Sequence, residues 1–350
     1  MKWLSIAVAC LPVLAQCASN TVEAGYHVIY SYSGIQVPSK LLNLIKQGKV
    51  GGVLLFGENV DSNLAGRIQD MQDAYRSSSA YAGSPLLIMT DQEGGQVRRL
   101  PGGPYLSEKE VGATSDPANS AHIAGEQAAG ALKTYNVNSN LAPVLGVYRQ
   151  EGDFLDQYGR SYSSDPDVAA ECAGAFVCSH QSHGAIATAK HWPGPGLAAA
   201  DENTDRRPVT LHASLNELRS IDEKPYHNAI QAGVDMIMPS WAIYPALDSQ
   251  YPSGLSSAWL KDELRGRLGY NGVVISDTMG GGSITGFGDW GERALLATNA
   301  GQDLLLGSGG DVDFGEKMCD ALIAALNDGS LDNSDFHASS QRILNLRQKI

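Results

Sequence analysis

An aspartate at the end of an apolar run is the residue of this chain best placed for chemistry. Asp277 directly follows the segment Val273–Ser276. Parallel strands that helices cover on both faces read as continuous apolar runs, and in a closed parallel barrel the active site lies at their carboxyl ends. A carboxylate at that position could act as a catalytic nucleophile. Aspartates at strand ends also commonly begin a turn or cap a helix, so this residue alone leaves both interpretations open.

Polar residues follow two other apolar runs in the same way. The motif Asp91–Gly95 ends in two glycines, which allow a sharp turn or the close approach of a ligand. Asp91 is therefore expected to accept hydrogen bonds from sugar hydroxyls, with an aspartate-initiated turn as the alternative. Lys190 and His191 open a stiff loop that is rich in proline and glycine. We expect Lys190 to contact a sugar oxygen, because buried lysines are seldom unpaired.

The loop after Lys190 and His191 carries three carboxylates close together. They are Asp201, Glu202 and Asp205. An acidic loop of this kind is most simply a solvated surface segment. It becomes a candidate for proton transfer only because it follows the same predicted strand end as Lys190.

Eight short apolar runs alternate with longer amphipathic segments, and this alternation predicts the fold. The predicted strands are His27–Tyr30, Gly52–Phe56, Leu86–Thr90, Val137–Ala142, Ala185–Lys190, Met236–Pro239, Val273–Ser276 and Asp303–Leu306. The predicted helices are Ser39–Gln47, Asn63–Tyr75, Asp116–Lys133, Pro166–His183, Ser214–Ala232, Ala258–Arg267 and Phe314–Leu326. The pattern favours an α/β fold with a single (β/α)8 TIM barrel over residues 20–350. A doubly wound open sheet has the same alternation and is the alternative.

Composition indicates a globular, acidic protein. Its 350 residues are 43% hydrophobic and 18% charged, and the formal net charge is −13. With no run of Lys or Arg to form a basic stripe, nucleic acid is not expected as a partner. The sequence contains no HExxH, CxxC or His/Cys cluster typical of a metal site.

The first residues predict export from the cell. Met1-Lys2-Trp3 and the apolar stretch to Leu14 are typical of a secretory signal peptide, over residues 1–15 with cleavage possibly as late as residue 18. The run is shorter than the roughly 20 residues that span a bilayer, so we expect a secreted, extracellular protein without stable membrane association. One disulfide is plausible there among Cys172, Cys178 and Cys319, with Cys17 as a further member if cleavage leaves it in the mature chain, but the spacing does not identify a pair.

Several separated motifs together resemble glycoside hydrolase family 3, in particular its single-domain β-N-acetylglucosaminidases. The resemblance extends from about Gly51 to Leu306. The motifs, in chain order, are Gly51–Phe56 with Asn59, Asp91–Gly95, Asn140–Val144, Arg160–Tyr162, Ser164–Pro166, Lys190–Gly194 and Ser276–Asp277.

The resemblance implies a retaining hydrolase that needs no cofactor. Asp277 would attack the anomeric carbon and form a covalent glycosyl-enzyme, which water then releases. Asp91, Arg160, Lys190 and His191 occupy the sugar-binding positions of the family. The implied activity is that of an exo-β-N-acetylglucosaminidase acting on chitin- or peptidoglycan-derived oligosaccharides.

One departure from the family pattern concerns the acid/base. The family's single-domain enzymes carry a histidine where this chain has Asn203, and an amide cannot exchange a proton at ordinary pH. A carboxylate of the same loop, Asp201, Glu202 or Asp205, could replace it if burial raises its pKa. Alternatively His183 or His212 is brought in, or the barrel has lost its acid and retains sugar binding or slow turnover. A β-glucosidase or transglycosylating relative is the remaining alternative.

Overall fold

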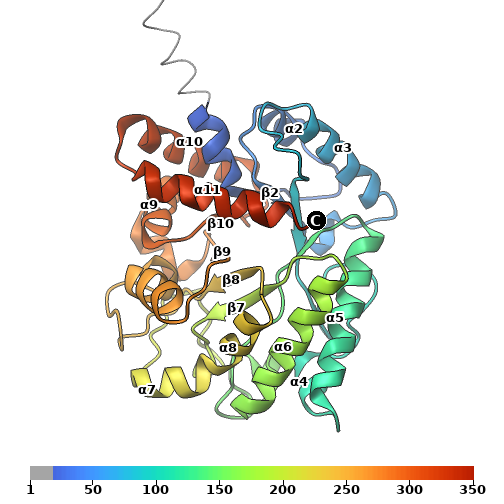
Figure 1. Cartoon of the computed structure of the whole chain (residues 1–350), viewed down its shortest axis with the longest axis vertical. Helices are drawn as coiled ribbons and strands as arrows, with labels where there is room; N and C mark the ends of the chain where they lie inside the picture. Colours follow the sequence, from blue (N-terminus) through green and yellow to red (C-terminus); the bar gives the residue numbers. More distant parts are fainter. Residues whose placement is uncertain (1–18) are drawn as a thin grey trace, which may run out of the picture.

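The computed structural model describes residues 19–350, and the predicted signal peptide lies outside them. Eight parallel strands form its centre (Figure 1). They are β1 (Val28–Ser31), β2 (Gly52–Leu54), β3 (Leu87–Thr90), β6 (Ser139–Asn140), β7 (Thr188–Trp192), β8 (Met236–Pro239), β9 (Val273–Thr278) and β10 (Leu304–Leu306). Each of the eight predicted strands is present, with ends shifted by up to three residues.

The sheet closes on itself. Its strand order is β6-β3-β2-β1-β10-β9-β8-β7, and all of these pairs are parallel. Isolated parallel bridges between Ser139 and Ile186 and between Val144 and Lys190 join the two outer strands. Consecutive strands are therefore neighbours around a ring, which confirms the (β/α)8 barrel and excludes the open doubly wound sheet.

Side chains of the strands divide into an inner and an outer set. Alternate residues such as Ile29, Leu54 and Met236 form one buried cluster inside the barrel. Their neighbours in sequence, including Val28, Val53 and Ile237, belong to clusters shared with the surrounding helices. Both faces of each strand are buried, which explains why the strands read as unbroken apolar runs.

The helices follow the strands in alternation around the barrel (Figure 1). They are α2 (Ser39–Lys46), α3 (Leu64–Arg76), α4 (Glu108–Gly112), α5 (Pro117–Thr134), α6 (Pro166–Ser182), α7 (Leu215–Glu217), η3 (Leu218–Asp222), α8 (Lys224–Gln231), η5 (Ala258–Arg267), α9 (Trp290–Ala300), α10 (Val312–Asp328) and α11 (Asn333–Arg347). Short 3₁₀ turns are η1 (Gly57–Asn59), η2 (Asp156–Tyr158), η4 (Ser253–Leu255) and η6 (Gly282–Phe287). The sequence did not predict α4, α9, α11 or the hairpin of β4 (Gln92–Gly94) and β5 (Val97–Arg98).

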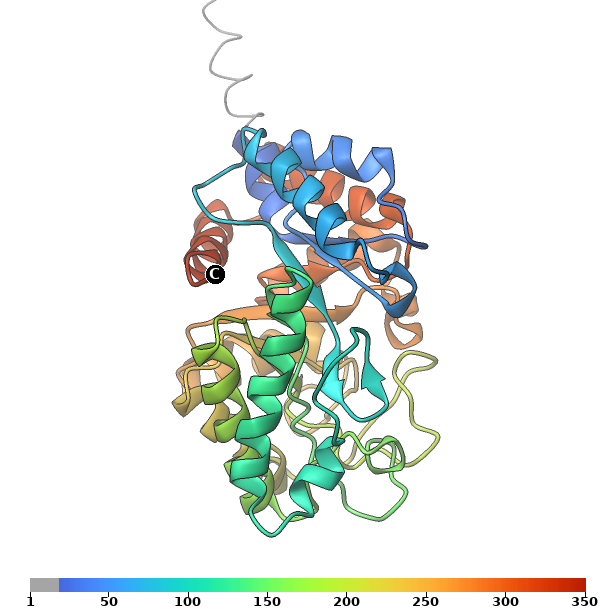
Figure 2. The same cartoon turned by 90° about the vertical axis from the view of Figure 1, so that its right-hand side faces the viewer.

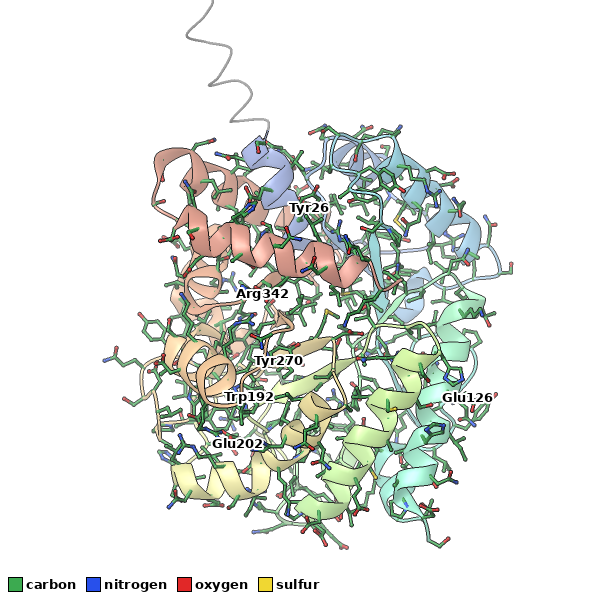
Figure 3. The ribbon with its side chains drawn as sticks, viewed as in Figure 1. Tyr26, Glu126, Trp192, Glu202, Tyr270 and Arg342 are labelled. Carbon is green, nitrogen blue, oxygen red and sulfur yellow. The ribbon has the colours of Figure 1, made fainter. Side chains whose placement is uncertain are left out.

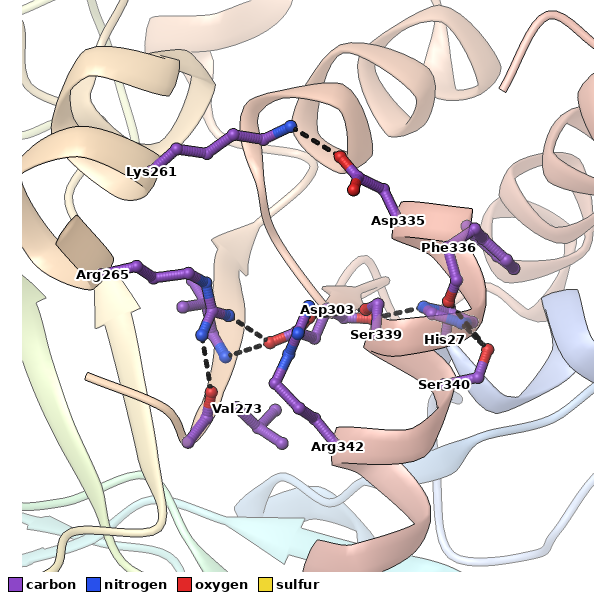
Figure 4. Close-up of polar contacts among 12 residues, drawn as sticks. His27, Lys261, Arg265, Val273, Asp303, Asp335, Phe336, Ser339, Ser340 and Arg342 are labelled. Atoms are coloured by element: carbon purple, nitrogen blue, oxygen red, sulfur yellow. Dashed lines mark hydrogen bonds and ion pairs between the residues drawn. The ribbon is translucent and has the colours of Figure 1, made fainter. Parts of the chain in front are cut away.

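Helix α11 lies across the amino ends of the strands. Figure 2 shows it on the side of the barrel opposite the β4–β5 hairpin. Arg347 donates to Gly51 O just before β2, and Lys349 pairs with Asp235 just before β8. Figure 4 shows Arg342 of α11 bound to Asp303, just before β10. The carboxyl ends of the strands are thereby left open at the other face.

The structure bears on the predicted disulfide and on membrane association. Cys172, Cys178 and Cys319 are all free thiols, so the plausible disulfide does not form within residues 19–350. In the same range none of the helices combines the length and the apolar character needed to cross a bilayer.

Candidate active site

A single cavity of about 690 Å³ opens at the carboxyl ends of the strands. This volume lies in the range of roughly 300–1,000 Å³ that is typical of ligand pockets. The predicted site residues that line it are Asp91, Arg160, Lys190, His191, Glu202, Asp205 and Asp277. Asp201 lies outside the wall, because its carboxylate is 85% exposed and pairs with Arg207 at 3.1 Å. The barrel thus brings seven of the eight predicted residues together.

Asp277 is held by the backbone around it. Its Oδ1 accepts from the Thr278 N–H at 2.6 Å, and the indole N–H of Trp241 donates to Thr278 O at 2.8 Å. Ser276 Oγ donates to Asp277 O and accepts from the Leu306 N–H of β10, at 2.7 and 2.8 Å. The end of β9 is therefore fixed on both sides, and the second carboxylate oxygen of Asp277 has no such bond within residues 19–350.

The ionisation of Asp277 depends on its surroundings. Burial, and then the negative charge of Asp205, raise the pKa of Asp277 to about 7. Lys190 and Arg160 act in the opposite direction and favour the carboxylate. The charged form of Asp277 is thus disfavoured by burial and by Asp205, and favoured by the Thr278 N–H and the two cations.

Four charged side chains form a network on the cavity wall beside Asp277. Lys190 Nζ lies 2.8 Å from Asp91 Oδ1 and 2.7 Å from Glu93 Oε1. Arg160 binds the same Glu93 with two N–H groups, each at 2.8 Å. Glu93 therefore joins the two predicted sugar-binding cations and fixes the direction of both.

The sequence did not single out Glu93, although it lies within the Asp91–Gly95 motif. Burial alone would raise the pKa of Glu93, but the charges of Arg160 and Lys190 outweigh it and hold the pKa well below its usual value. Behind it, burial and then the charge of Glu93 raise the pKa of Glu108 well above the usual value. The network thus combines two cations with the carboxylates Asp91 and Glu93, while burial and the charge of Glu93 favour the neutral form of Glu108.

His191 is the one histidine, among the described residues, that lines the cavity. Burial, and then the positive charges of Lys190 and Arg160, lower the pKa of His191 well below its usual value. Its imidazole is therefore neutral and suits hydrogen bonding to a sugar hydroxyl better than proton donation. His183 and His212, considered from the sequence as substitutes for the missing acid, are not part of the wall.

Aromatic side chains border the cavity, but Trp192 and Trp241 near the strand ends are not among them. Trp192 is buried against Tyr226, with ring centroids 5.1 Å apart, and Trp241 is buried beneath the end of β9. Figure 3 labels Trp192 at the end of β7 and Glu202 in the loop that follows this strand. The cavity is instead bordered by Phe56, Phe154, Trp290 and Phe314, which sequence patterns do not distinguish from core aromatics.

Replacing Glu93 by glutamine tests the network. The change keeps the size of the side chain but leaves Lys190 and Arg160 without their shared anion, so both should lose their fixed direction. Small displacements of positioning groups cost about 10²-fold in rate, and we expect kcat/KM to fall by about that factor. Glu110→Gln is the control, because Glu110 is an exposed capping-box residue for which glutamine is acceptable. Equal kcat/KM for the two variants would contradict this role of Glu93.

The side chains of the cavity wall indicate the kind of ligand that it can hold. No group of His, Cys, Asp or Glu within residues 19–350 is arranged to hold a metal ion. The cavity combines Asp277, a half-buried nucleophile candidate, with fixed cations, fixed carboxylates and an aromatic border. These features are expected of a site that binds a polyhydroxylated ring.

Comparison with known proteins gives consistent findings. The model of the glycosyl hydrolase family 3 N-terminal domain matches residues 22–346. A protein of Arthroderma benhamiae described as an uncharacterized secreted glycosyl hydrolase is 47% identical over 351 residues, which cover 100% of this chain and 99% of the relative. A β-hexosaminidase of Tolumonas auensis is 35% identical over 282 residues, with 78% and 80% of the two chains covered.

Solved structures agree with the sequence relatives. A glycoside hydrolase family 3 β-N-acetylglucosaminidase from Paenibacillus sp. has a TM-score of 0.87 at 30% identity and covers 94% of this chain. This chain spans 62% of the length of that enzyme. A β-N-acetylhexosaminidase from Beutenbergia cavernae has a TM-score of 0.84 at 26% identity, with 94% of this chain and 98% of its own covered.

Proposed function

Since this chain belongs to glycosyl hydrolase family 3, we propose that it is a secreted, retaining exo-β-N-acetylglucosaminidase. It is a glycoside hydrolase of the β-N-acetylhexosaminidase type, and its substrates are carbohydrates. The proposed substrates are chitin- or peptidoglycan-derived oligosaccharides with a terminal β-linked N-acetylglucosamine. Export is supported by the predicted signal peptide and by the relative described as secreted.

One observation carries the proposal: Asp277 shares a cavity with the network of Asp91, Glu93, Lys190 and Arg160. The network takes up sugar hydroxyls and fixes the ring, which places the anomeric carbon against the free oxygen of Asp277. The carboxylate attacks that carbon, and the aglycone leaves with a proton from an acid. Water then cleaves the glycosyl ester with the help of the resulting base.

A second candidate is a barrel that binds such sugars with little turnover. It is favoured by Asn203, which lines the cavity in place of the family's acid/base histidine. Such a protein would bind the sugar and cleave only substrates whose leaving group departs without a proton.

Turnover by the purified secreted protein separates these functions. We would measure release of N-acetylglucosamine from chitobiose and of the phenol from a 2,4-dinitrophenyl β-N-acetylglucosaminide, with the corresponding β-glucoside as control. Cleavage of both N-acetylglucosaminides in preference to the glucoside is the expected result. Cleavage of the activated substrate alone would favour the impaired barrel, and preference for the glucoside would reject the N-acetyl assignment.

A further inference from the structure

The loop after β7 contains a polar turn at the position where the family's acid/base histidine is expected. Asn203 Oδ1 accepts from the Asp205 N–H at 2.8 Å. Asn203 O accepts from the N–H groups of Arg206 and Arg207, each at 3.1 Å. Asparagine commonly forms such side-chain turns, and here the turn reverses the chain so that Asp205 lines the cavity. Asn203 thus has a structural role that explains its presence without proton transfer.

This loop is docked on the loop that follows the nucleophile strand. The Gly282 N–H donates to Asp205 O at 2.8 Å, and the Ser283 N–H donates to Thr204 O at 3.0 Å. The close contact between these two loop backbones requires glycine at position 282, because a Cβ on Gly282 would lie 2.4 Å from Arg206 O. Asp205 and Asp277 are therefore carried by two segments that are bonded to each other, at the edge of one cavity.

The three carboxylates of the loop differ in what already binds them. Asp201 pairs with Arg207 outside the cavity. Glu202 lines the cavity, but its Oε2 accepts from the Ala199 N–H at 2.9 Å and so closes a turn of its own loop. Within residues 19–350, no hydrogen bond or ion pair engages the carboxylate of Asp205. Of the two that line the cavity, Asp205 has both carboxylate oxygens unengaged within residues 19–350, whereas Glu202 has one oxygen bound in its own loop.

The charge of Asp205 acts on Asp277 across the cavity that both residues line. This charge is the second cause, after burial, that raises the pKa of Asp277. Two carboxylates that repel each other in this way disfavour the state in which both are ionised. An enzyme that needs one ionised nucleophile and one protonated acid uses such a pair in its singly protonated form.

We propose that Asp205 is the general acid and base of this enzyme, positioned by the Asn203 turn. The assignment depends on the proposed hydrolysis through Asp277. In the first step Asp277 forms a bond to the anomeric carbon, the bond from that carbon to the leaving oxygen breaks, and the leaving oxygen takes the proton of Asp205. In the second step the Asp205 carboxylate takes a proton from water, the water oxygen bonds to the anomeric carbon, and Asp277 leaves as a carboxylate.

Asp205→Asn tests the assignment through the leaving group. Loss of general acid catalysis typically costs about 10²–10⁴-fold, so chitobiose turnover should fall by that factor. The first turnover of the dinitrophenyl substrate, whose phenolate leaves without a proton, should stay close to that of the parent. Added azide, which needs no base, should raise steady-state turnover of the variant and yield the β-glycosyl azide.

Asp201→Asn is the matched control, because it makes the same change in the same loop outside the cavity. It should turn over chitobiose like the parent. The assignment would be overturned if Glu202→Gln, and not Asp205→Asn, showed the leaving-group effect and the azide rescue. It would also be overturned if Asp205→Asn were as active as the control. In both cases the proposed function would stand. A parent inactive on both substrates would instead reject the proposed function, and the assignment with it.

The pH profile of the same variant gives a second readout. The acid limb of kcat/KM on the dinitrophenyl substrate should reflect ionisation of Asp277, near its pKa of about 7. Removing the negative charge of Asp205 makes ionisation of Asp277 easier, so the limb should move to lower pH in Asp205→Asn. Burial, the larger cause, remains and keeps the pKa above that of an exposed aspartate. An acid limb that does not move would show that the two groups do not face each other.

Discussion

Asp277→Asn is expected to abolish turnover of every β-N-acetylglucosaminide, including the dinitrophenyl substrate that needs no acid. Removal of a member of a nucleophilic catalytic unit lowers kcat by about 10⁴–10⁶-fold, and we expect a loss in this range. The amide cannot form the glycosyl ester, whereas its oxygen can still accept from the Thr278 N–H. The loss should therefore occur without a change in fold.

Stability provides a check that separates chemistry from misfolding. The pKa of Asp277 is raised in the folded protein, so ionisation of this group disfavours folding and stability falls as pH rises from about 4 to about 7. Asparagine carries no charge, so Asp277→Asn should unfold at a temperature no lower than the parent at pH 8. A clearly lower unfolding temperature would attribute the lost activity to structure.

Asp311→Asn is the matched control for the nucleophile. Asp311 caps α10 after the neighbouring strand β10 by accepting from the Asp313 N–H, and asparagine caps equally well. This variant should retain the activity of the parent. If Asp277→Asn kept the activity of the Asp311→Asn control, the nucleophile would have to be another residue.

The barrel could be predicted from the sequence because its strands and helices leave local, periodic patterns of apolar residues. Apolar runs mark strands such as β3, β8 and β9, and helices such as α2 and α10 bury a regular apolar face. Helix α11 was missed because its buried face includes Ser339, Ser340 and Arg347, which give no apolar stripe. Such a helix is held by polar contacts to distant segments, and those contacts depend on the folded barrel.

The site residues at strand ends could be predicted from the sequence, but the contacts that distinguish the loop residues could not. Asp277, Asp91 and Lys190 follow strand ends, and the barrel necessarily brings strand ends to one face. The difference between Asp201 and Asp205 was not predictable, because it arises from the Asn203 turn and from docking on Gly282. Glu93 was likewise hidden, because its function as a bridge appears only when Arg160 and Lys190 lie on either side of it.

The polar cluster at the other end of the barrel carries the largest expected effect on stability. Asp303 is buried and binds Arg265 at 2.7 Å and Arg342 at 2.8 Å. It also accepts from Ser339 Oγ at 2.5 Å and from the Val274 N–H at 2.7 Å (Figure 4). This carboxylate therefore joins η5, β9 and α11 at the point where the C-terminal helix covers the barrel.

Asp303→Ala is expected to lower the free energy of unfolding by about 3–5 kcal/mol, the usual cost of removing one partner from a buried ion pair. Two mostly buried guanidinium groups lose their common anion, and Ser339 and Val274 lose their acceptor. Asp335→Ala is the matched control at the same face, because it breaks an exposed pair with Lys261 that should contribute less than about 1 kcal/mol. Urea unfolding of both variants measures the difference.

Because α11 is fixed through Asp303 while the cavity lies at the opposite ends of the strands, the folded fraction of Asp303→Ala should keep the kcat of the parent. Equal losses of stability in the two variants would mean that other contacts hold α11 against the barrel.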